Sequence, residues 1–377
     1  MQINVLILYD KLLPLMTLKF NQTYFTDRLI KKVSLPKLLI GIGGLLTIVI
    51  LDLFLWRTRI IQEGLPDLTL GHLLRSMIIG LSVLIIVVAC LEAKPSLLLT
   101  KANGKLRQVF SIIGIQLLSM FILCLFFYSS SIFNAVSLED SILEWSSFLA
   151  WFSGCIVFLI TLVKLPKAYH SKKMTSFFLV GLVVVFFILA MEEVSWFQRI
   201  LGIRRSMFIF RWNEQGEINI HNFATNLSEV TFYFGSFLLM VVIPFICILF
   251  CNQYQNYSWY VFIPRPFMII IGAFACAYNF DMWNIIFTQI AFWGALIITV
   301  VIFLFSQKRR DKLLALVSAI ILVVSQVSFL LNGQSFVLNI FVITEYKEFL
   351  IALGALIYAL DVSFILENKL VKNQPAK

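Results

Sequence analysis

The sequence predicts an all-α fold, a polytopic transmembrane helix bundle of about ten spans, and three observations lead to this fold class. Hydrophobic residues make up 60% of the 377 residues and charged residues only 13%, whereas a soluble domain carries about 25% charged and 45–50% apolar residues. The mean hydropathy is +0.93. Apolar runs close to the roughly 20 residues that a helix needs to cross a bilayer recur along the chain. A water-soluble globule and a disordered chain are therefore excluded.

The apolar runs divide the chain into three parts. Residues 1–37 are predicted to form a cytoplasmic or interfacial arm, because charged residues and a proline interrupt the first apolar stretch and no cleavage site of small residues follows it. Residues 38–366 form a single transmembrane domain, and residues 367–377 form a cytoplasmic tail. The predicted spans are, in order, 38–56, 75–91, 109–128, 143–163, 174–191, 230–251, 266–280, 284–305, 313–332 and 348–366.

The run 266–280 is the shortest of these. It follows Pro264 and Pro266, and a link of only three residues, Asp281, Met282 and Trp283, joins it to the next run. The sequence leaves open whether this run is a full span. The two runs together are a candidate for a tight helical hairpin.

Small residues inside the spans indicate helix packing. Gly41, Gly43 and Gly44 lie in the first span with no strand before them and no Lys-Ser/Thr after them, so the close approach of another helix explains them better than a nucleotide-binding loop does. The six cysteines are scattered through the apolar runs. We interpret them as small hydrophobic residues and predict neither a disulfide framework nor a thiolate metal site.

Basic residues are distributed unevenly between the predicted loops, and this orients the bundle. They are rare in the loops 129–142 and 333–347, which contain only Lys347 between them. They concentrate in the segments 1–37, 92–108, 164–173 and 306–312. Because cytoplasmic loops are enriched in Lys and Arg, both termini are predicted to be cytoplasmic, in a multi-pass protein of the cell membrane. The net charge of +10 then reflects topology, and nucleic acid is not an expected partner.

The densest polar stretch begins where the fifth predicted span ends, at Glu192 and Glu193. If the helix continues, Glu192, Trp196 and Arg199 lie on one stripe and Glu193 lies on another face, so the two carboxylates point in different directions. Adjacent acids at the edge of an apolar segment are costly unless they are paired, hydrated or metal-bound, which makes both candidates for a functional site. Gln198 is a candidate substrate contact beside them. The alternative is that both glutamates emerge into headgroup water.

Residues 200–212 combine arginines with large apolar side chains. Arg204 and Arg205 precede a run rich in phenylalanine that ends at Trp212, a mixture that suits a helix or re-entrant turn at headgroup level. The guanidinium groups are candidates to bind phosphate. Simple anchoring in the interface is the alternative.

The next segment contains Glu217, His221 and Asn222. In a helix, Glu217 and His221 are one turn apart and can share a metal or a proton, whereas in a strand they lie on one face but roughly 13 Å apart. Gly216 and the isoleucines weaken the helical alternative, so both stay open. A divalent metal is the cofactor for which the sequence gives an indication, with Glu193 and His221 as candidate ligands. A hydrogen-bonded structural histidine is the alternative.

Other acidic residues are assigned by their position in the predicted helices. Glu229 completes the spacing of a capping box and is assigned to the start of the sixth span rather than to the site. Glu345 fits the first turn of the last span, with Thr344 as its cap. Glu348 lies one turn deeper on the same face, so it is a candidate for substrate binding. Asp361 lies nearer the inner end and is interpreted as a packed polar group.

Two motifs in the polar stretch resemble those of a widespread family of uncharacterised bacterial multi-span membrane proteins. They are Glu-Glu-x-Ser-Trp-x-Gln-Arg at residues 192–199 and Asn-x-Gln-Gly-Glu-x-Asn-x-His-Asn at residues 213–222, with Glu345 and Glu348 as a looser match. The family has no established activity. The resemblance therefore implies a bacterial membrane and marks a site, and it does not name a reaction.

These residues suggest an enzyme that acts at the outer face of the membrane on a lipid or lipid-linked, phosphate-bearing substrate, with membrane lipids as partners. The expected catalytic acid–base residues or metal ligands are Glu192, Glu193, Glu217 and His221. The expected substrate-binding residues are Gln198, Arg199, Arg204, Arg205, Asn222 and Glu348. One alternative is a proton- or ion-coupled transporter or flippase, which predicts functional polar residues at mid-membrane. A non-catalytic membrane scaffold is the other.

Overall fold

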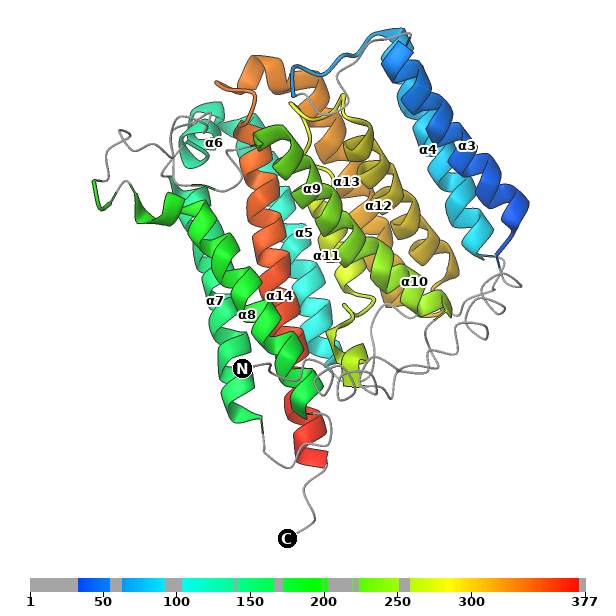
Figure 1. Cartoon of the computed structure of the whole chain (residues 1–377). Helices are drawn as coiled ribbons and strands as arrows, with labels where there is room; N and C mark the ends of the chain where they lie inside the picture. The colour runs from blue at the N-terminus through cyan, green and yellow to red at the C-terminus, as the bar shows by residue number, and fades with distance from the viewer. Residues whose placement is uncertain are drawn as a thin grey trace, which may run out of the picture.

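A computed structural model of the chain describes residues 33–54, 63–91, 104–138, 141–165, 172–198, 200–202, 219, 224–250 and 258–372. This part of the chain is an all-α bundle without strands (Figure 1). Nine of its helices are long and apolar enough to cross a membrane. The protein is therefore an integral, multi-pass membrane protein, as the composition predicts.

The long helices follow the predicted runs, with ends that shift by a few residues. They are α3 (Leu35–Phe54), α4 (Leu70–Leu91), α5 (Lys105–Tyr128), α7 (Ile142–Lys164), α8 (Lys172–Glu193), α9 (Thr225–Phe237) continued by α10 (Ile243–Phe250), α12 (Ile286–Phe305), α13 (Arg309–Phe336) and α14 (Val342–Lys372). A π-helical turn, Leu238–Val242, joins α9 to α10, so these two form one span. A short helix, α6 (Ser130–Val136), follows α5.

The predicted run 266–280 is not a full-length helix. Only Met268–Ala275 (α11) is helical, and the chain continues through turns to the start of α12. Arg265 binds Asp361, and Asp281 accepts a hydrogen bond from Thr344. Because Thr344 and Asp361 are 17 positions apart on α14, about 25 Å at 1.5 Å per residue, the segment between Arg265 and Asp281 passes through most of the bundle.

This broken passage is covered on every side. Residues 265–283 are all buried, and α11 packs against α14, α12 and the π-helical turn. Non-helical backbone at membrane depth is tolerated only where protein buries it, because lipid cannot satisfy its N–H and C=O groups. Within the described residues, the segment with the short α11 therefore adds a tenth passage to the nine long spans. The helix α3 begins at the end of the bundle at which α14 ends (Figure 1).

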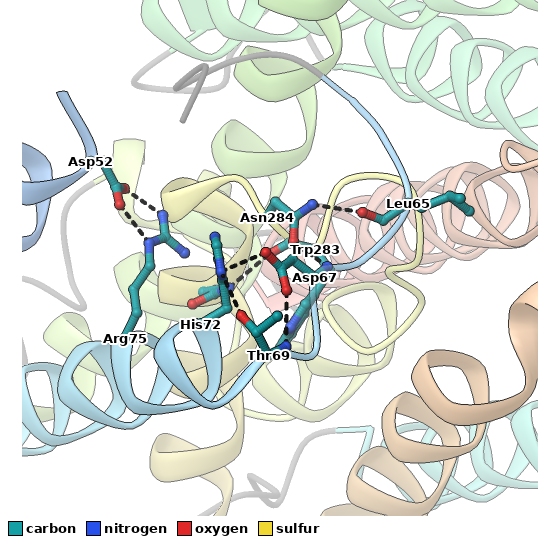
Figure 2. Close-up of polar contacts among 9 residues, drawn as sticks. Asp52, Leu65, Asp67, Thr69, His72, Arg75, Trp283 and Asn284 are labelled. Atoms are coloured by element: carbon teal, nitrogen blue, oxygen red, sulfur yellow. Dashed lines mark hydrogen bonds and ion pairs between the residues drawn. The ribbon is translucent and has the colours of Figure 1, made fainter. Parts of the chain in front are cut away.

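The first hairpin confirms the packing predicted from glycine at Gly41 and Gly44, whereas a Cβ atom on Gly43 would have nothing within 4 Å. A Cβ atom on Gly41 would lie 2.8 Å from the Ser82 carbonyl oxygen, and one on Gly44 would lie 2.3 Å from Ser82 Oγ. Only residues without a side chain allow α3 to approach α4 this closely. A buried ion pair also joins the two helices, in which Arg75 donates to Asp52 from Nε at 2.7 Å and from Nη2 at 2.5 Å (Figure 2).

Candidate functional site

The end of α8 has an unusual backbone. The helix stops at Glu193, and Ser195, Trp196 and Phe197 have φ angles of 46°, 53° and 58°. The prediction that the helix continues and places Glu192, Trp196 and Arg199 on one stripe is therefore wrong. A left-handed conformation costs roughly 1–2 kcal/mol per residue with a side chain, so the surrounding structure must hold this turn in place.

Three contacts hold the left-handed turn. The Trp196 indole donates to Glu192 Oε1 at 2.7 Å. Asn219 Nδ2 donates to Ser195 Oγ at 3.1 Å, and both of these side chains are buried. Phe197 packs edge-on against Phe148 of α7. Asn219, from the segment between α8 and α9, therefore lies at the end of α8.

Glu193 points away from Glu192, as predicted, and into the bundle. Its carboxyl group interacts with those of Glu144, Glu345 and Glu348, and the Trp151 indole lies beside it. Glu192 instead faces Trp196. The alternative in which both glutamates emerge into headgroup water is thus wrong for Glu193.

Glu348 joins the same group of carboxylates through α9. The Tyr233 hydroxyl donates a hydrogen bond to Glu348 Oε1. The structure therefore brings together Glu193 and Glu348, two of the predicted site residues that are far apart in the sequence. Gln198, another predicted site residue, is buried just beyond the left-handed turn.

Lys347, which the sequence analysis counted only as a loop charge, lies inside the bundle. It is 4% exposed, its ammonium group donates to Asn279 Oδ1 at 2.7 Å, and Nζ lies 4.2 Å from the centre of the Tyr233 ring. Asn279 belongs to the non-helical segment after α11, and it exchanges two hydrogen bonds with Gln326 of α13. One ammonium group thus links α14, α9 and the broken passage.

Asp281 is fully buried next to this ammonium group. Its Oδ1 accepts from Thr344 Oγ1 at 2.5 Å, whereas Oδ2 has no hydrogen-bond partner in the described part of the chain. Thr344 lies within α14, which begins at Val342, so its predicted role as a helix cap is wrong. Glu345 does lie in the first turn, as predicted.

Glu229 also belongs to the site, and its assignment to a capping box is wrong. The residue at the N-cap of α9 is Ala224, and no side chain caps the helix there. The Glu229 carboxyl group instead hydrogen-bonds that of Glu63 and interacts with Glu348 and Asp281. Sequence spacing could not show this contact, because Glu63 comes from the link between α3 and α4.

The link that carries Glu63 is fixed to the start of α12 (Figure 2). Asn284 accepts a hydrogen bond from the Asp67 amide at 2.9 Å and donates one to the Leu65 carbonyl at 2.8 Å. Asp67 also lies 2.7 Å from His72 Nδ1 and accepts from the Thr69 amide. Partial burial raises the pKa of Asp67, but the Thr69 hydrogen bonds and the His72 charge outweigh this effect and hold the pKa below its ordinary value.

We call this group of residues the carboxylate cluster. Its members are Glu63, Glu144, Glu193, Glu229, Asp281, Glu345 and Glu348. Among the described residues, Lys347 is the cation that interacts with them. Within the described ranges, no three His, Cys, Asp or Glu side chains are placed to hold one metal ion. Buried carboxyl groups that repel one another do not all ionise, so protons or the ammonium group must neutralise part of the cluster.

Several predicted site residues lie outside the described residues. These are Arg199, Arg204, Arg205, Glu217, His221 and Asn222. Their roles, and the divalent metal at Glu193 and His221, stay predictions. Asn219, two positions from both Glu217 and His221, is the residue of that stretch that the structure places at the end of α8.

The opposite end of α14 carries a second buried ionic group, which we call the arginine cluster. Arg265 donates to both carboxylate oxygens of Asp361, and Arg107 Nη2 donates to Oδ1 at 2.6 Å. Arg107 also donates to the Leu360 carbonyl and lies over the Phe364 ring. Asp361 is therefore a packed polar group, as predicted.

With this geometry established, the chain can be compared with known proteins. It matches no protein-family model, no curated protein and no solved structure. The resemblance to bacterial multi-span membrane proteins therefore stays a prediction.

Proposed function

We propose that the protein is a proton-coupled membrane transporter whose proton-binding site is the carboxylate cluster. The observation that carries this proposal is the contact of carboxyl groups with one another at the end of the bundle, where Glu229 of α9 hydrogen-bonds Glu63 of the link between α3 and α4 and both residues are half-buried. A hydrogen bond between two carboxyl groups requires a proton on one of them, because an ionised carboxylate has only acceptors. The site is therefore built to take up and release protons.

The position of the cluster favours transport over an enzyme at the membrane surface. Lys347 and Asn279 meet where the chain is non-helical between α11 and α12. Transporters bind substrates and coupling ions at interrupted helices, and buried ionisable residues in membrane spans mark such pathways. The pocket lined by Tyr233, Thr288 and Lys347 has room for about one water molecule. That space suits a proton or a water molecule better than a lipid headgroup.

The proposal includes a membrane, an orientation and a class of cargo. We place the protein in a bacterial cell membrane with both termini in the cytoplasm, so that the carboxylate cluster faces outward. The cargo is an anionic amphiphile, a lipid or lipid-linked phosphate, because Arg199, Arg204 and Arg205 supply forked donors that match phosphate. Proton uptake by the cluster would then accompany movement of this anion.

The test is the charge displaced when pH is changed. Purified protein in liposomes is adsorbed on a solid-supported electrode, and the transient current after a pH jump is recorded. We expect a current that decreases in Glu193→Gln and in Glu229→Gln and is lost in the double variant. Glu367→Gln is the matched control, because Glu367 is an exposed residue of the same α14 that carries Glu348. Equal currents in all variants would contradict the proposal.

The left-handed turn favours a second candidate, an acid–base enzyme at the outer face. It holds three residues with side chains in a costly conformation directly beside Glu192 and Glu193, and such strain is often found at catalytic sites. Lipid mass spectrometry of null, wild-type and Glu193→Gln strains tests this candidate. An enzyme requires that Glu193→Gln reproduce the lipid changes of the null strain while its pH-jump current equals that of the wild type.

A further inference from the structure

Buried polar side chains continue from Lys347 toward the opposite end of the bundle. The first step is the pair Asn279 and Gln326, in which Asn279 Nδ2 donates to Gln326 Oε1 at 2.9 Å and Gln326 Nε2 returns a bond to the Asn279 carbonyl at 2.7 Å. Both residues are 1% exposed. The polar group at the carboxylate cluster thus extends into the interface of α11 and α13.

The next step lies between α5, α11 and α13. The hydroxyl groups of Tyr278 and Ser119 are 2.6 Å apart, and neither residue is exposed. Ser325 lies beside Tyr278. The Ser325 hydroxyl is fully buried and faces the Tyr278 hydroxyl, but it makes no hydrogen bond of ordinary length and angle in the described part of the chain.

One turn further along α5, Gln116 makes the third step. Its Nε2 donates to Ser318 Oγ and to the Leu314 carbonyl, both at 2.8 Å. Ser318 and Ser325 are seven positions apart, so they lie on the same face of α13, and Asp311 lies seven positions before Ser318. Asp311 is also fully buried.

These residues extend along most of the membrane. Asp311 and Gln326 are 15 positions apart on α13, about 23 Å of helix against a hydrocarbon core of about 30 Å. The longest break is between Ser318 and Asp311, about 10 Å. Ala315 and Ile112, both fully buried, lie within that break on α13 and α5.

Helix packing alone explains part of this arrangement, because hydroxyl and amide groups join helices in membranes. Among the described residues, it leaves the buried Ser325 hydroxyl and the second Asp281 oxygen without a hydrogen bond of ordinary geometry. A buried polar atom without a partner costs about 1–3 kcal/mol, and a water molecule removes that cost where several polar groups converge. Tyr278, Ser119 and Ser325 provide such a group.

We propose that the interface of α5, α11 and α13 holds a file of water that carries protons between the carboxylate cluster and the opposite end of the bundle. Each water or hydroxyl group accepts a proton on one side and releases one on the other, so one proton moves and only O–H bonds change. The apolar break at Ala315 and Ile112 is the gap that water must bridge for a proton to reach Asp311. The direction of proton movement rests on the proposed function, whereas the water file itself does not.

Substituted cysteines test whether the file contains water. Ser119→Cys, Ser318→Cys and Ser325→Cys are compared with Leu117→Cys and Val324→Cys, which lie at similar depths but face outward. A small water-soluble methanethiosulfonate reacts with the thiolate, which forms only in contact with water. We expect the three file positions to react at least about tenfold faster than the two controls. The wild-type chain gives the background from the native cysteines.

A measurement on the unmodified protein keeps the proposal testable if a cysteine variant misfolds. In X-ray footprinting, hydroxyl radicals form from bound water and modify the side chains that touch it. We expect modification of the buried Tyr278 and none of Phe126 or Phe329, which are equally buried, Phe329 lying directly beside Tyr278. Equal thiol rates at file and control positions, or an unmodified Tyr278, would overturn the water file. Neither result depends on the pH-jump currents that test the transporter.

Discussion

The two ends of α14 show two ways to bury charge in a membrane. At the arginine cluster, two guanidinium groups surround the Asp361 carboxylate, and Arg265 occupies both of its oxygens. At the carboxylate cluster, Glu193 faces other carboxyl groups, and Lys347 is the ammonium group among them. The first group is satisfied by fixed partners, whereas the second needs protons to complete it.

This difference separates a structural ion pair from a working site. Fixed partners make a buried charge part of the packing, as also at Asp52 and Arg75, which are both 1% exposed. A buried group whose charge depends on bound protons responds to its surroundings instead. We therefore expect substitutions at the two clusters to differ in size, in sign and in their dependence on pH.

The largest effect is expected from Asp361→Asn. It leaves two guanidinium groups next to each other without their carboxylate, and removal of one partner of a buried ion pair typically costs about 3–5 kcal/mol. Unfolding of the purified protein in detergent measures this loss. The matched control is Glu367→Gln on the same helix, at an exposed residue. A loss no larger than that of the control would show that the arginine cluster is not structural.

A smaller, pH-dependent loss is expected from Lys347→Met. The cluster can replace the lost ammonium charge by binding a proton, so the cost at neutral pH should be about 1–3 kcal/mol. Because the folded variant then holds protons that the unfolded chain releases, its stability falls as pH rises. Unfolding at several pH values checks the slope. A loss that is the same at all pH values would contradict proton compensation.

Glu348→Gln should change the free energy of unfolding by less than about 1 kcal/mol in either direction, because two opposing effects nearly cancel. It removes one charge from a group of carboxylates, which lowers repulsion, but it also weakens the hydrogen bond from Tyr233. The comparison is Asp52→Asn, which breaks a bidentate pair and should destabilise strongly. Equal losses of stability in the two variants would remove the distinction between the carboxylate cluster and a fixed buried ion pair.

The smallest effect is expected from Asp67→Asn, in the link that carries Glu63. Ionised Asp67 is stabilised by Thr69 and His72, so its lowered pKa contributes stability above the pKa of the unfolded chain, and this contribution is lost as pH falls through the folded value. At a partly exposed site, where solvent screens the charge, this is worth less than about 1 kcal/mol. The unfolding difference from wild type should disappear in acid, and a constant difference would show that the hydrogen-bond geometry matters more than charge.

The sequence predicts the spans well because hydropathy and length decide them. It also identifies Glu193 and Glu348, because a carboxylate at the boundary of an apolar run is conspicuous wherever it lies in the fold. The spacing of a capping box led to the wrong assignment of Glu229, which hydrogen-bonds Glu63, 166 positions away in the sequence. Such contacts depend on which helices become neighbours, and no local pattern encodes that.

Lys347, Asn279 and Gln326 could not be found for the same reason. Their contacts with one another form because the chain is non-helical after α11. The sequence of a short apolar run does not show where its helix ends. One signal was present in the sequence, the seven-residue spacing of Asp311, Ser318 and Ser325, which places polar groups on one face of α13. Without a partner helix, that spacing alone does not distinguish a buried polar face from an exposed one.

The short α11 also sets an order for biogenesis. Eight residues are far too few to hold a segment across a bilayer during insertion, and two of the elements that bury it, α13 and α14, leave the ribosome after it. The backbone from Arg265 to Trp283 therefore stays unsheltered until the last helix arrives. The final helix acts as the closing step of assembly, and a chain truncated before Val342 would expose this passage to membrane quality control.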